Sequence, residues 1–293
     1  MRLDWNLLES FAAVAEHGSL SAAARAIGAS QPTLSRHITA LEQQIGARLF
    51  EREKSGVALT ATGATLLTHA QDMADSASKL SMAIEGRAET LTGTIRLTAS
   101  QIMATYVLPE ILTELRQAEP SVDVELVATD KTENLLRREA DIAVRMYRPT
   151  QEDVISRKIG ELKMGMYASR TYVEQFGLLG SIDDAGDHSV IGYDRSTQII
   201  EGFKAAGLDV DREFFAFRSD DQVVCWEMAK AGYGIGFNQV QIGDKERNMV
   251  RIESAGEVGR LPVWLTAHSE LRASPRVRFV FDFLAEKLGE KTR

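Results

Sequence analysis

The sequence predicts an α/β protein that carries an all-α module at its N-terminus. Three patterns along the 293 residues support this fold class. Apolar residues recur at helical spacing through the first fifty positions, and a heptad pattern follows them. From Thr94 onward, short apolar strands alternate with amphipathic helices. We therefore expect a small helical domain over 1–63, a linker helix and hinge over 64–93, and an α/β domain over 94–293.

The first helices pack around a small core. A supporting helix is expected near the N-terminus, with the inward positions Leu7, Leu8, Phe11, Val14 and Ala15. A second helix follows, with Ser19 or Ser21 as its cap and Gly28 at the turn that ends it. Its expected inner face consists of Ala23, Ala24 and Ile27.

A third helix follows this turn, with Ser30 as its cap and Pro32 in its first turn, where a missing N–H costs no hydrogen bond. Its core stripe consists of Leu34, Ile38, Leu41 and Ile45. The opposite side is polar and suits a DNA major groove, where Arg36 is able to donate a bidentate pair to a guanine edge. The candidates for DNA contact are Ser30, Gln31, Pro32, Thr33, Ser35, Arg36 and Thr39. An ordinary helical hairpin with a solvated polar face is the alternative.

This part of the chain resembles the LysR-type transcriptional regulators, whose N-terminal module has the same residues at the same spacing. The shared positions are Ser19, Ala22, Ala23, Ala24, Ile27, Ser30, Gln31, Pro32, Ser35, Ile38, Leu41, Glu42, Ile45, Gly46, Leu49, Phe50 and Arg52. The resemblance implies a winged helix-turn-helix, with the third helix in the major groove and the wing at the adjacent minor groove or backbone. It adds Arg52 and Lys54 of the wing as DNA-binding candidates. Because Glu51 and Glu53 flank them, we expect this wing to contribute less affinity.

The net charge of −8 is distributed unevenly, and the acidic excess lies outside the helical module. Residues 1–63 contain six basic and six acidic side chains, whereas 94–293 contain 26 and 32. A neutral module is a weak anchor on DNA, because non-specific affinity comes mainly from cations on phosphates. Binding as a dimer is therefore needed to compensate.

The linker helix carries a heptad seam that predicts the pairing of two chains. Its members are Leu66, Ala70, Met73, Ala77, Leu80 and Ile84. A coiled coil is established by about three to four heptads, and this seam is shorter. An amphipathic helix packed on its own domain is therefore the alternative. The resemblance favours pairing, since these regulators dimerise through this helix, and it implies a homodimer or homotetramer.

The remainder of the chain alternates between strands and helices. The expected strands are 94–98, 122–128, 141–145, 164–168, 189–193, 213–217, 234–237 and 263–267. The expected helices are 104–118, 132–139, 199–206, 219–231 and 275–288, the last capped by Ser274. Such alternation favours parallel sheets covered by helices.

This region resembles the type 2 periplasmic-binding-like effector domain of the same family, which implies two α/β lobes around a small molecule. We place lobe I at about 94–161 and 267–293 and lobe II at about 162–266, so the final helix returns to lobe I.

Ligands of open α/β sheets lie at the carboxyl ends of strands, beside helix N-termini. The effector-binding candidates there are Ser100, Gln101, Thr129, Arg145, Tyr193, Arg195, Ser196 and Ser219. By position, Ser100 and Thr129 match the family's commonest effector contacts. Hydroxyl groups backed by Arg145 suit a carboxylate-bearing metabolite. Structural roles are the alternatives, with Ser219 in a helix capping box and Arg145 paired with a nearby carboxylate.

Motifs of other function classes do not occur in the sequence. There is no G-x-S-x-G or G-x-G-x-x-G run, and the five histidines are scattered. Cys225 lies in an apolar helix beside Trp226, which favours an inert core thiol. We expect no enzyme activity, no cofactor and no metal. The alternative function is a small-molecule-binding protein or enzyme that uses the hairpin only for packing.

Composition favours a cytoplasmic regulator. The chain is 44% hydrophobic and has a single cysteine, which excludes an intrachain disulfide framework. No segment resembles a signal peptide, and no apolar run approaches the length of a membrane span. The predicted partners are double-stranded DNA and a small-molecule effector, with RNA polymerase as a further candidate and no membrane.

Overall fold

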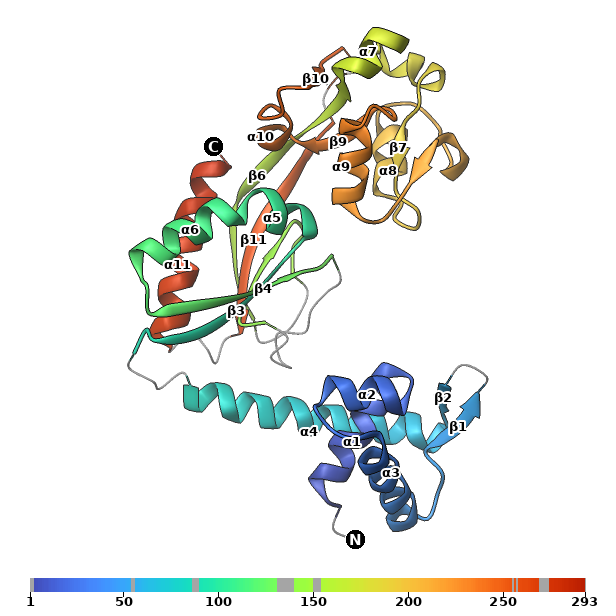
Figure 1. The fold of residues 1–293 in the computed structure, drawn as a ribbon, viewed down its shortest axis with the longest axis vertical. Coiled ribbons are helices and arrows are strands. Elements are labelled where there is room, and N and C mark those ends of the chain that lie inside the picture. Colours follow the sequence, from blue (N-terminus) through green and yellow to red (C-terminus); the bar gives the residue numbers. More distant parts are fainter. Residues whose placement is uncertain are drawn as a thin grey trace. The chain divides into compact units, whose positions relative to one another are not determined.

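The computed structural model describes residues 3–53, 56–85, 90–130, 140–149, 154–254, 256, 258–268 and 274–292. The chain divides into two compact units, Met1–Ala83 and Ile84–Arg293. Figure 1 labels the helices and strands of both units.

The first unit begins with the predicted helices, which are α1 (Trp5–His17), α2 (Leu20–Ala26) and α3 (Gln31–Ile45). The Ser19 hydroxyl accepts a hydrogen bond from the Ala22 N–H, and the Ser30 hydroxyl accepts one from the Thr33 N–H. Both predicted caps are therefore confirmed. Gly28 has a φ of 66°, which side chains disfavour, and it turns the chain between α2 and α3.

The core of this unit contains the predicted stripes. Phe11, Ala23, Leu34 and Leu41 have no exposed surface. The prediction for Ile27 is wrong, because its side chain is 41% exposed. This residue is the C-cap of α2, so the backbone already leaves the helix there and the helical face no longer continues.

The wing is an antiparallel hairpin of β1 (Phe50–Glu53) and β2 (Gly56–Leu59). It is fixed to the helices at both strands. The Glu42 carboxylate on α3 accepts a hydrogen bond of 2.7 Å from the Leu49 N–H, just before β1. The Val57 N–H in β2 donates a 3.1 Å hydrogen bond to the Gly18 carbonyl, between α1 and α2. These bonds hold the wing at a defined position on the module.

The linker helix α4 (Ala61–Glu85) carries the predicted seam, and its two ends differ. Ala70 is 1% exposed and belongs to the core of the first unit, against which Leu66 also packs. These positions follow the alternative of a helix packed on its own domain. Met73 is 48% exposed, and Ala77 is exposed as well. The side chains of Leu80 and Ile84 lie outside the described residues.

Within the described residues, the second unit contains a mixed sheet of seven strands. In lobe I, β3 (Gly93–Ala99) pairs in parallel with β4 (Val122–Ala128) and β5 (Ile142–Arg145), as predicted. In contrast, β11 (Arg260–His268) is antiparallel to β5 and to β6 (Val154–Ser169). The expectation of parallel sheets is therefore wrong for β6 and β11.

Strand β6 connects the lobes. Its first part pairs with β11, and its residues from Met164 onward pair with β9 (Gly236–Gln239) and β10 (Met249–Ile252) of lobe II. Figure 1 shows this long strand passing from one lobe into the other. The sequence predicts only 164–168, because the first part carries many charged residues on a partly exposed strand and lacks an apolar pattern.

The rest of lobe II surrounds these strands. Its remaining helices and strands are α7 (Arg170–Phe176), β7 (Ile191–Gly192), α8 (Gln198–Ala205), β8 (Phe217–Arg218), α9 (Gln222–Lys230) and α10 (Val240–Gly243). A 3-10 turn, Arg212–Phe214, occupies the first two residues of the predicted strand 213–217, and β8 begins only at Phe217, so the prediction is wrong for all but its last residue. The Asp211 carboxylate accepts hydrogen bonds from the N–H groups of Glu213 and Phe214, which favours a turn over a strand.

The predicted helix 104–118 is two helices, α5 (Gln101–Tyr106) and α6 (Leu108–Ala118). Pro109 has no N–H to continue the ladder of α5, but it fits the first turn of α6. The predicted helix 132–139 lies outside the described residues.

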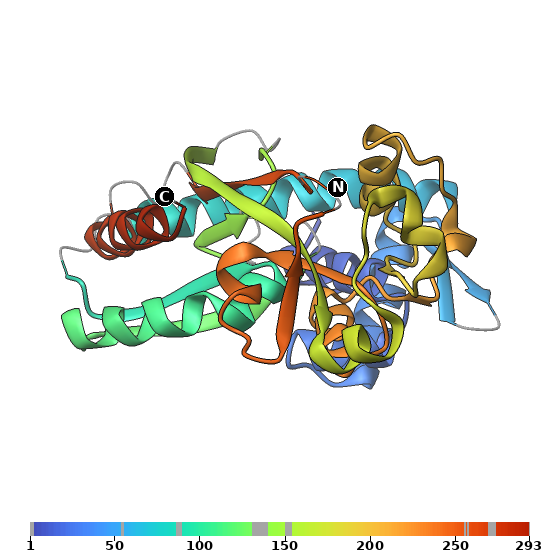
Figure 2. The same ribbon diagram turned by 90° about the horizontal axis from the view of Figure 1, so that it is seen from above.

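The final helix, α11 (Pro275–Lys291), returns to lobe I as predicted, and the Ser274 hydroxyl caps it. Lys287 and Lys291 form ion pairs of 2.6 Å and 2.7 Å with Glu114 and Glu110 of α6. Figure 2 shows α11 beside the strands of lobe I. In the described part of the chain, no helix has the length and apolar character of a membrane span.

Candidate nucleic-acid interface and inter-lobe cavity

Helix α3 presents a polar face to solvent. Its exposed predicted residues are Ser30, Gln31, Pro32, Ser35, Arg36 and Thr39, and Thr33 is partly exposed. The stripe of Leu34, Ile38 and Leu41 on the opposite side is buried. The core therefore fixes which side of α3 faces outward, and that side carries the hydrogen-bonding groups that base edges and phosphates require.

Several side chains on this face are already oriented by local hydrogen bonds. The Thr39 hydroxyl donates to the Ser35 carbonyl at 2.9 Å, and Arg36 Nε donates to the Pro32 carbonyl at 3.4 Å. The Ser21 hydroxyl on α2 donates to the Gln31 side-chain oxygen at 3.1 Å. A bond through Nε leaves the terminal nitrogens of Arg36 at the outer end of the side chain, which suits a contact with a base edge.

His37 lies at the border of this face and has a structural partner. The Ser10 hydroxyl on α1 is 2.7 Å from His37 Nδ1. Ser10 itself is 3% exposed. This contact joins the buried side of α1 to α3 and helps to fix the angle at which α3 is presented. The side chain of the wing residue Arg52 and all of Lys54 lie outside the described residues.

The second unit contains a cavity of about 290 Å³ between its lobes, termed here the inter-lobe cavity. Four predicted residues line it, namely Ser100, Arg145, Tyr193 and Ser196. The cavity is also lined by Asp130, Met146, Tyr147, Gln198, Asp220, Gln222 and Leu261. Residues of β5 and of the loop after β3 form its lobe I side, and residues around α8 and α9 form its lobe II side.

Ser100 and Arg145 are the buried polar residues of the lobe I side. Ser100 is 6% exposed, and its hydroxyl has no hydrogen-bond partner among the described residues. Arg145 is 5% exposed and donates 3.0 Å hydrogen bonds to the Thr129 carbonyl and to the Thr98 hydroxyl. A buried hydroxyl without a partner is unfavourable. A ligand oxygen placed beside it would remove that penalty.

The charges around this cavity are mixed. Arg145 is positive, whereas Asp130 and Asp220 are negative. Burial raises the pKa of Asp130 above its ordinary value, against the opposing effects of the Gln101 N–H and of Arg145. Asp220 is different, because its Oδ1 accepts hydrogen bonds of 3.1, 2.9 and 3.2 Å from the N–H groups of residues 194, 195 and 196. These bonds, led by that of Arg195, lower the pKa of Asp220.

The other predicted residues do not line the cavity. Gln101 bridges the lobes, since its Nε2 donates a 3.1 Å hydrogen bond to Asp221 Oδ2. Thr129 contributes its carbonyl to Arg145. The Arg195 side chain is 89% exposed. The structure therefore places these residues around the cavity or in solvent.

Ser219 is not the helix cap that the sequence predicts. Asp221 caps α9, accepting hydrogen bonds from the N–H groups of Val223 and Val224. The Ser219 hydroxyl accepts a 3.2 Å hydrogen bond from the Asp221 N–H instead. The predicted capping box is therefore wrong by two positions, because two successive aspartates offered equivalent caps and the sequence does not distinguish them.

The sequence did not predict most of the other residues that line the inter-lobe cavity. Gln198 and Gln222 are the first residues of α8 and α9, a position where cavity residues recur in α/β proteins. That signal was present in the sequence. Leu261 carries no such signal, because it reaches the cavity from β11 only through the pairing of β11 with β6.

Cys225 behaves as a buried thiol. Its Sγ is 3.1 Å from the Ser219 carbonyl, and burial raises its pKa to about 11. The thiolate is therefore scarce at neutral pH. Among the described residues, no group of three or more His, Cys, Asp or Glu side chains is arranged to hold a metal ion.

Two family models match the chain. The model of the bacterial regulatory helix-turn-helix protein, lysR family, matches residues 5–64. The model of the LysR substrate binding domain matches residues 88–289. Together they cover both units.

Individual relatives agree with these models. The uncharacterized HTH-type transcriptional regulator YhjC of Escherichia coli strain K12 is 31% identical over 186 residues, which are 64% of this chain and 62% of YhjC. The HTH-type transcriptional regulator ClcR of Pseudomonas putida is 33% identical over 180 residues, which are 60% of each chain. The alignments thus span about three fifths of these relatives.

A solved structure has the same fold over nearly the whole chain. The full-length structure of AphB, a Vibrio cholerae virulence activator and member of the LTTR protein family, has a TM-score of 0.66. The match covers 97% of this chain and 99% of AphB at 20% identity. These similar proteins are regulators of transcription rather than enzymes.

Proposed function

The chain belongs to the LysR family of bacterial transcriptional regulators, and we propose that it binds an operator as a dimer whose DNA affinity responds to a small carboxylate. The observation that carries DNA binding is the outward polar face of α3, opposite a fully buried stripe. In this proposal Arg36 and Gln31 contact base edges, and Ser30, Thr33, Ser35 and Thr39 contact bases or phosphates. Arg52 and Lys54 of the wing add backbone contacts. A protein acting on DNA in this way works in the cytoplasm.

The dimer forms through the second half of α4. Met73 and Ala77 continue the helical face on which Leu66 and Ala70 are covered by their own unit. Beyond Ala70, the last residue of α4 in the core of that unit, the face emerges as exposed apolar surface, and Leu80 and Ile84 extend the pattern in the sequence. An exposed methionine on a heptad position supports pairing with a second copy. The domain limits proposed from the sequence, 1–63, 64–93 and 94–293, place this face in the linker.

The effector occupies the inter-lobe cavity. The unpartnered Ser100 hydroxyl and the fixed Arg145 guanidinium support a ligand that has a carboxylate. Tyr193 and Ser196 approach from lobe II, so a ligand that contacts both sides stabilises one arrangement of the lobes. An effector changes DNA affinity only through different affinities for two arrangements of the dimer.

Asp130 makes this proposal sensitive to pH. A charged Asp130 repels a ligand carboxylate, and its raised pKa allows it to be protonated more readily than an ordinary aspartate. Carboxylate binding is therefore expected to strengthen as the pH falls through the pKa of Asp130. Asp130→Asn removes the repulsion, so it strengthens carboxylate binding and abolishes this pH dependence. A cationic ligand shows the opposite response to Asp130→Asn.

The test uses the full chain. Genomic fragments selected by the protein give the operator, and the genes beside it indicate which carboxylates to try. Affinity for the operator is then measured with and without each compound, for the wild type and for Ser100→Phe. The bulky side chain is expected to abolish the response while operator binding persists, because Ser100 lies in the other unit. An unchanged response in Ser100→Phe places the effector site elsewhere.

A further inference from the structure

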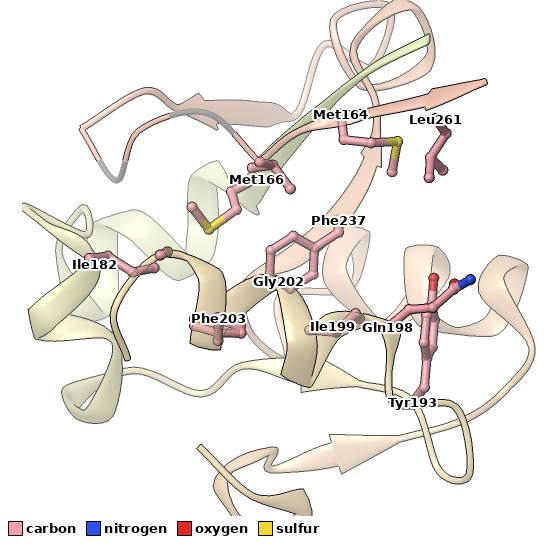
Figure 3. A pocket seen from close by; sticks show the side chains of 12 residues that line it. Met164, Met166, Ile182, Tyr193, Gln198, Ile199, Gly202, Phe203, Phe237 and Leu261 are labelled. Atoms are coloured by element: carbon pink, nitrogen blue, oxygen red, sulfur yellow. The ribbon is translucent and has the colours of Figure 1, made fainter. Parts of the chain in front are cut away.

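A second cavity of about 150 Å³ lies in lobe II, next to the inter-lobe cavity. It is termed here the tail pocket and is defined by Met164 and Met166 of β6, Ile199 and Phe203 of α8, and Phe237 of β9. Figure 3 shows the methionines on one side, the α8 residues on the other, and the Phe237 ring between them. The walls are apolar, in contrast to the inter-lobe cavity.

The two cavities adjoin. Tyr193, Gln198 and Leu261 line both of them. A gap of about 40 Å³ is lined by the same three residues, and it also shares Met164 with the tail pocket and Met146 with the inter-lobe cavity. The cavities are therefore neighbours that share walls, with a polar end at Ser100 and an apolar end at Phe203.

Aromatic contacts keep the apolar end in shape. The Phe203 ring meets the Phe237 ring edge to face, with centroids 6.0 Å apart, and it meets the Phe215 ring at the same distance. The two methionines on the opposite wall adapt to different shapes. A dry cavity of this size with apolar walls accommodates a group as large as benzene.

Helix α8 and its C-cap present small residues to the tail pocket. The lining positions 198, 199, 202, 203 and 206 form one helical face, and Gly202 and Ala206 lie in its middle. A Cβ on Gly202 would meet no atom within 4 Å. Gly202 is exposed and lines the tail pocket, so a larger side chain there meets no clash at its Cβ and is expected to extend over the pocket. Glycine is unfavourable inside a helix, so the advantage of Gly202 is the space that it leaves beside the tail pocket.

We propose that the tail pocket binds the apolar end of the effector, which makes the effector an amphipathic monocarboxylate with a ring or a short hydrocarbon chain. This inference rests on the proposed function, in which the carboxylate lies at Ser100 and Arg145. The polar and apolar ends of these adjoining cavities match the two ends of such a molecule. The distance between those ends then determines which ligand length binds best.

The experiment measures binding of straight-chain carboxylates to the full chain by calorimetry. The probes are butanoate, hexanoate, octanoate and decanoate, with octanedioate as the matched diacid. Affinity is expected to rise about fourfold for each added methylene until the tail pocket is full. Octanedioate is expected to bind on the order of a hundredfold more weakly than octanoate, because its second carboxylate loses hydration in an apolar cavity.

Two variants place a larger side chain on the lining of the tail pocket, at Gly202 of α8 and at Ala206, the C-cap of α8. Gly202→Leu and Ala206→Leu are each expected to erase most of the gain between butanoate and octanoate, on the order of a hundredfold, while butanoate binds as before. Gly186→Leu is the matched control, since a Cβ there also meets no atom within 4 Å and Gly186 does not line the tail pocket. Gly186→Leu is expected to leave the whole series unchanged.

The outcomes separate this inference from the proposed function. If butanoate binding depends on Ser100 but chain length has no effect, the tail pocket is not a subsite and the carboxylate site stands. If octanoate binds equally to the wild type and to both α8 variants, the inference is overturned as well. If Ser100→Phe leaves butanoate and octanoate binding unchanged, the inter-lobe site itself is wrong.

Discussion

The DNA-reading face and the inter-lobe cavity are assembled in different ways. The face lies on one helix, between Ser30 and Thr39, so the geometry of α3 fixes the relative positions of its side chains. The cavity draws Ser100, Arg145 and Leu261 from separate elements of both lobes. A buried stripe orients the face, whereas the cavity depends on the pairings that join β3, β5 and β11 in the mixed sheet. Local changes are therefore expected to act differently in the two regions.

The largest expected effect concerns the exposed second half of α4. The proposed dimer forms there, and only a dimer presents a second DNA-reading face. Met73→Asp places a charge on the proposed seam, so dimers are expected to dissociate in sedimentation experiments. Operator affinity should then fall by about a hundredfold or more, because the second half-site no longer benefits from effective concentration. The fold of the first unit is expected to persist, since Met73 is 48% exposed.

Thr68→Asp is the control for this charge. Thr68 is also exposed and lies on the opposite side of α4. This variant should remain dimeric. A dimeric Met73→Asp protein would show that the chains pair through another surface.

The next effect is confined to the face itself. Arg36→Ala is expected to cost about 1–3 kcal/mol of operator binding, the range for one bidentate base contact. Arg36→Lys separates the two kinds of contact, because lysine keeps the charge but not the planar fork. A base contact predicts that Arg36→Lys loses nearly as much as Arg36→Ala, measured by titration of labelled operator. Full recovery with lysine would assign Arg36 to a phosphate.

The comparison also explains which predictions from the sequence succeeded. On α3, the core stripe and the outward face follow from a period of 3.6 residues, and the cap follows from the serine before the first turn. The structure confirms the cap and the outward face and buries Leu34, Ile38 and Leu41 of the stripe, whereas Ile45 is partly buried. Ile27 failed because it lies at a helix end, where the period stops. Helical periodicity predicts which residues are buried in the middle of a helix, but it does not apply at the last residue, where the backbone leaves the helix.

The cavity was predictable only in part, for a related reason. Ser100 and Arg145 follow or end strands whose apolar pattern is plain, so their positions could be inferred. Leu261 and the first half of β6 depend on antiparallel pairing across the lobes, which no local pattern specifies. The choice between Ser219 and Asp221 as a cap depended on where α9 begins, to within two residues.

Packing around glycine gives a third contrast. Gly63 in α4 is buried, and a Cβ there would lie 2.2 Å from the Leu49 carbonyl oxygen, a backbone atom that cannot move aside cheaply. Gly63→Ala is expected to destabilise the first unit by about 1–3 kcal/mol through overpacking. Gly202→Ala meets open space and should stabilise α8 by up to about 1 kcal/mol through helix propensity.

Hydrogen exchange resolved by residue measures both variants in the full chain, because the two units need not unfold together. Protection should fall around the wing in Gly63→Ala and rise in α8 in Gly202→Ala. Similar changes at both sites would mean that the two regions are packed alike.

The smallest expected effect compares two carboxylates that order backbone in the two regions. Glu42 accepts hydrogen bonds from the Leu49 and Phe50 N–H groups beside the wing, and Asp220 accepts three from residues 194–196 beside the cavity. The pKa of Asp220 is lowered from 3.8, led by the bond from the Arg195 N–H. Because the pKa of Asp220 is lower in the folded state, its carboxylate stabilises the fold at pH values above its unfolded-state pKa. That stabilisation is lost as the pH falls through the folded value.

Asp220→Asn keeps a side-chain oxygen as acceptor but removes the charge. At pH 7 it is expected to lower the free energy of opening of the 194–196 loop by at most about 1 kcal/mol, because Asp220 is exposed and water screens the interaction. The difference between the wild type and Asp220→Asn should shrink below the unfolded pKa of 3.8 and vanish once the wild-type side chain is protonated. Exchange of the residue 194–196 amides, followed from pH 7 down to the acid limit of the fold, measures it. Since the loop faces the inter-lobe cavity, a difference independent of pH would mean that the shape of Asp220, and not its charge, orders this side of the cavity.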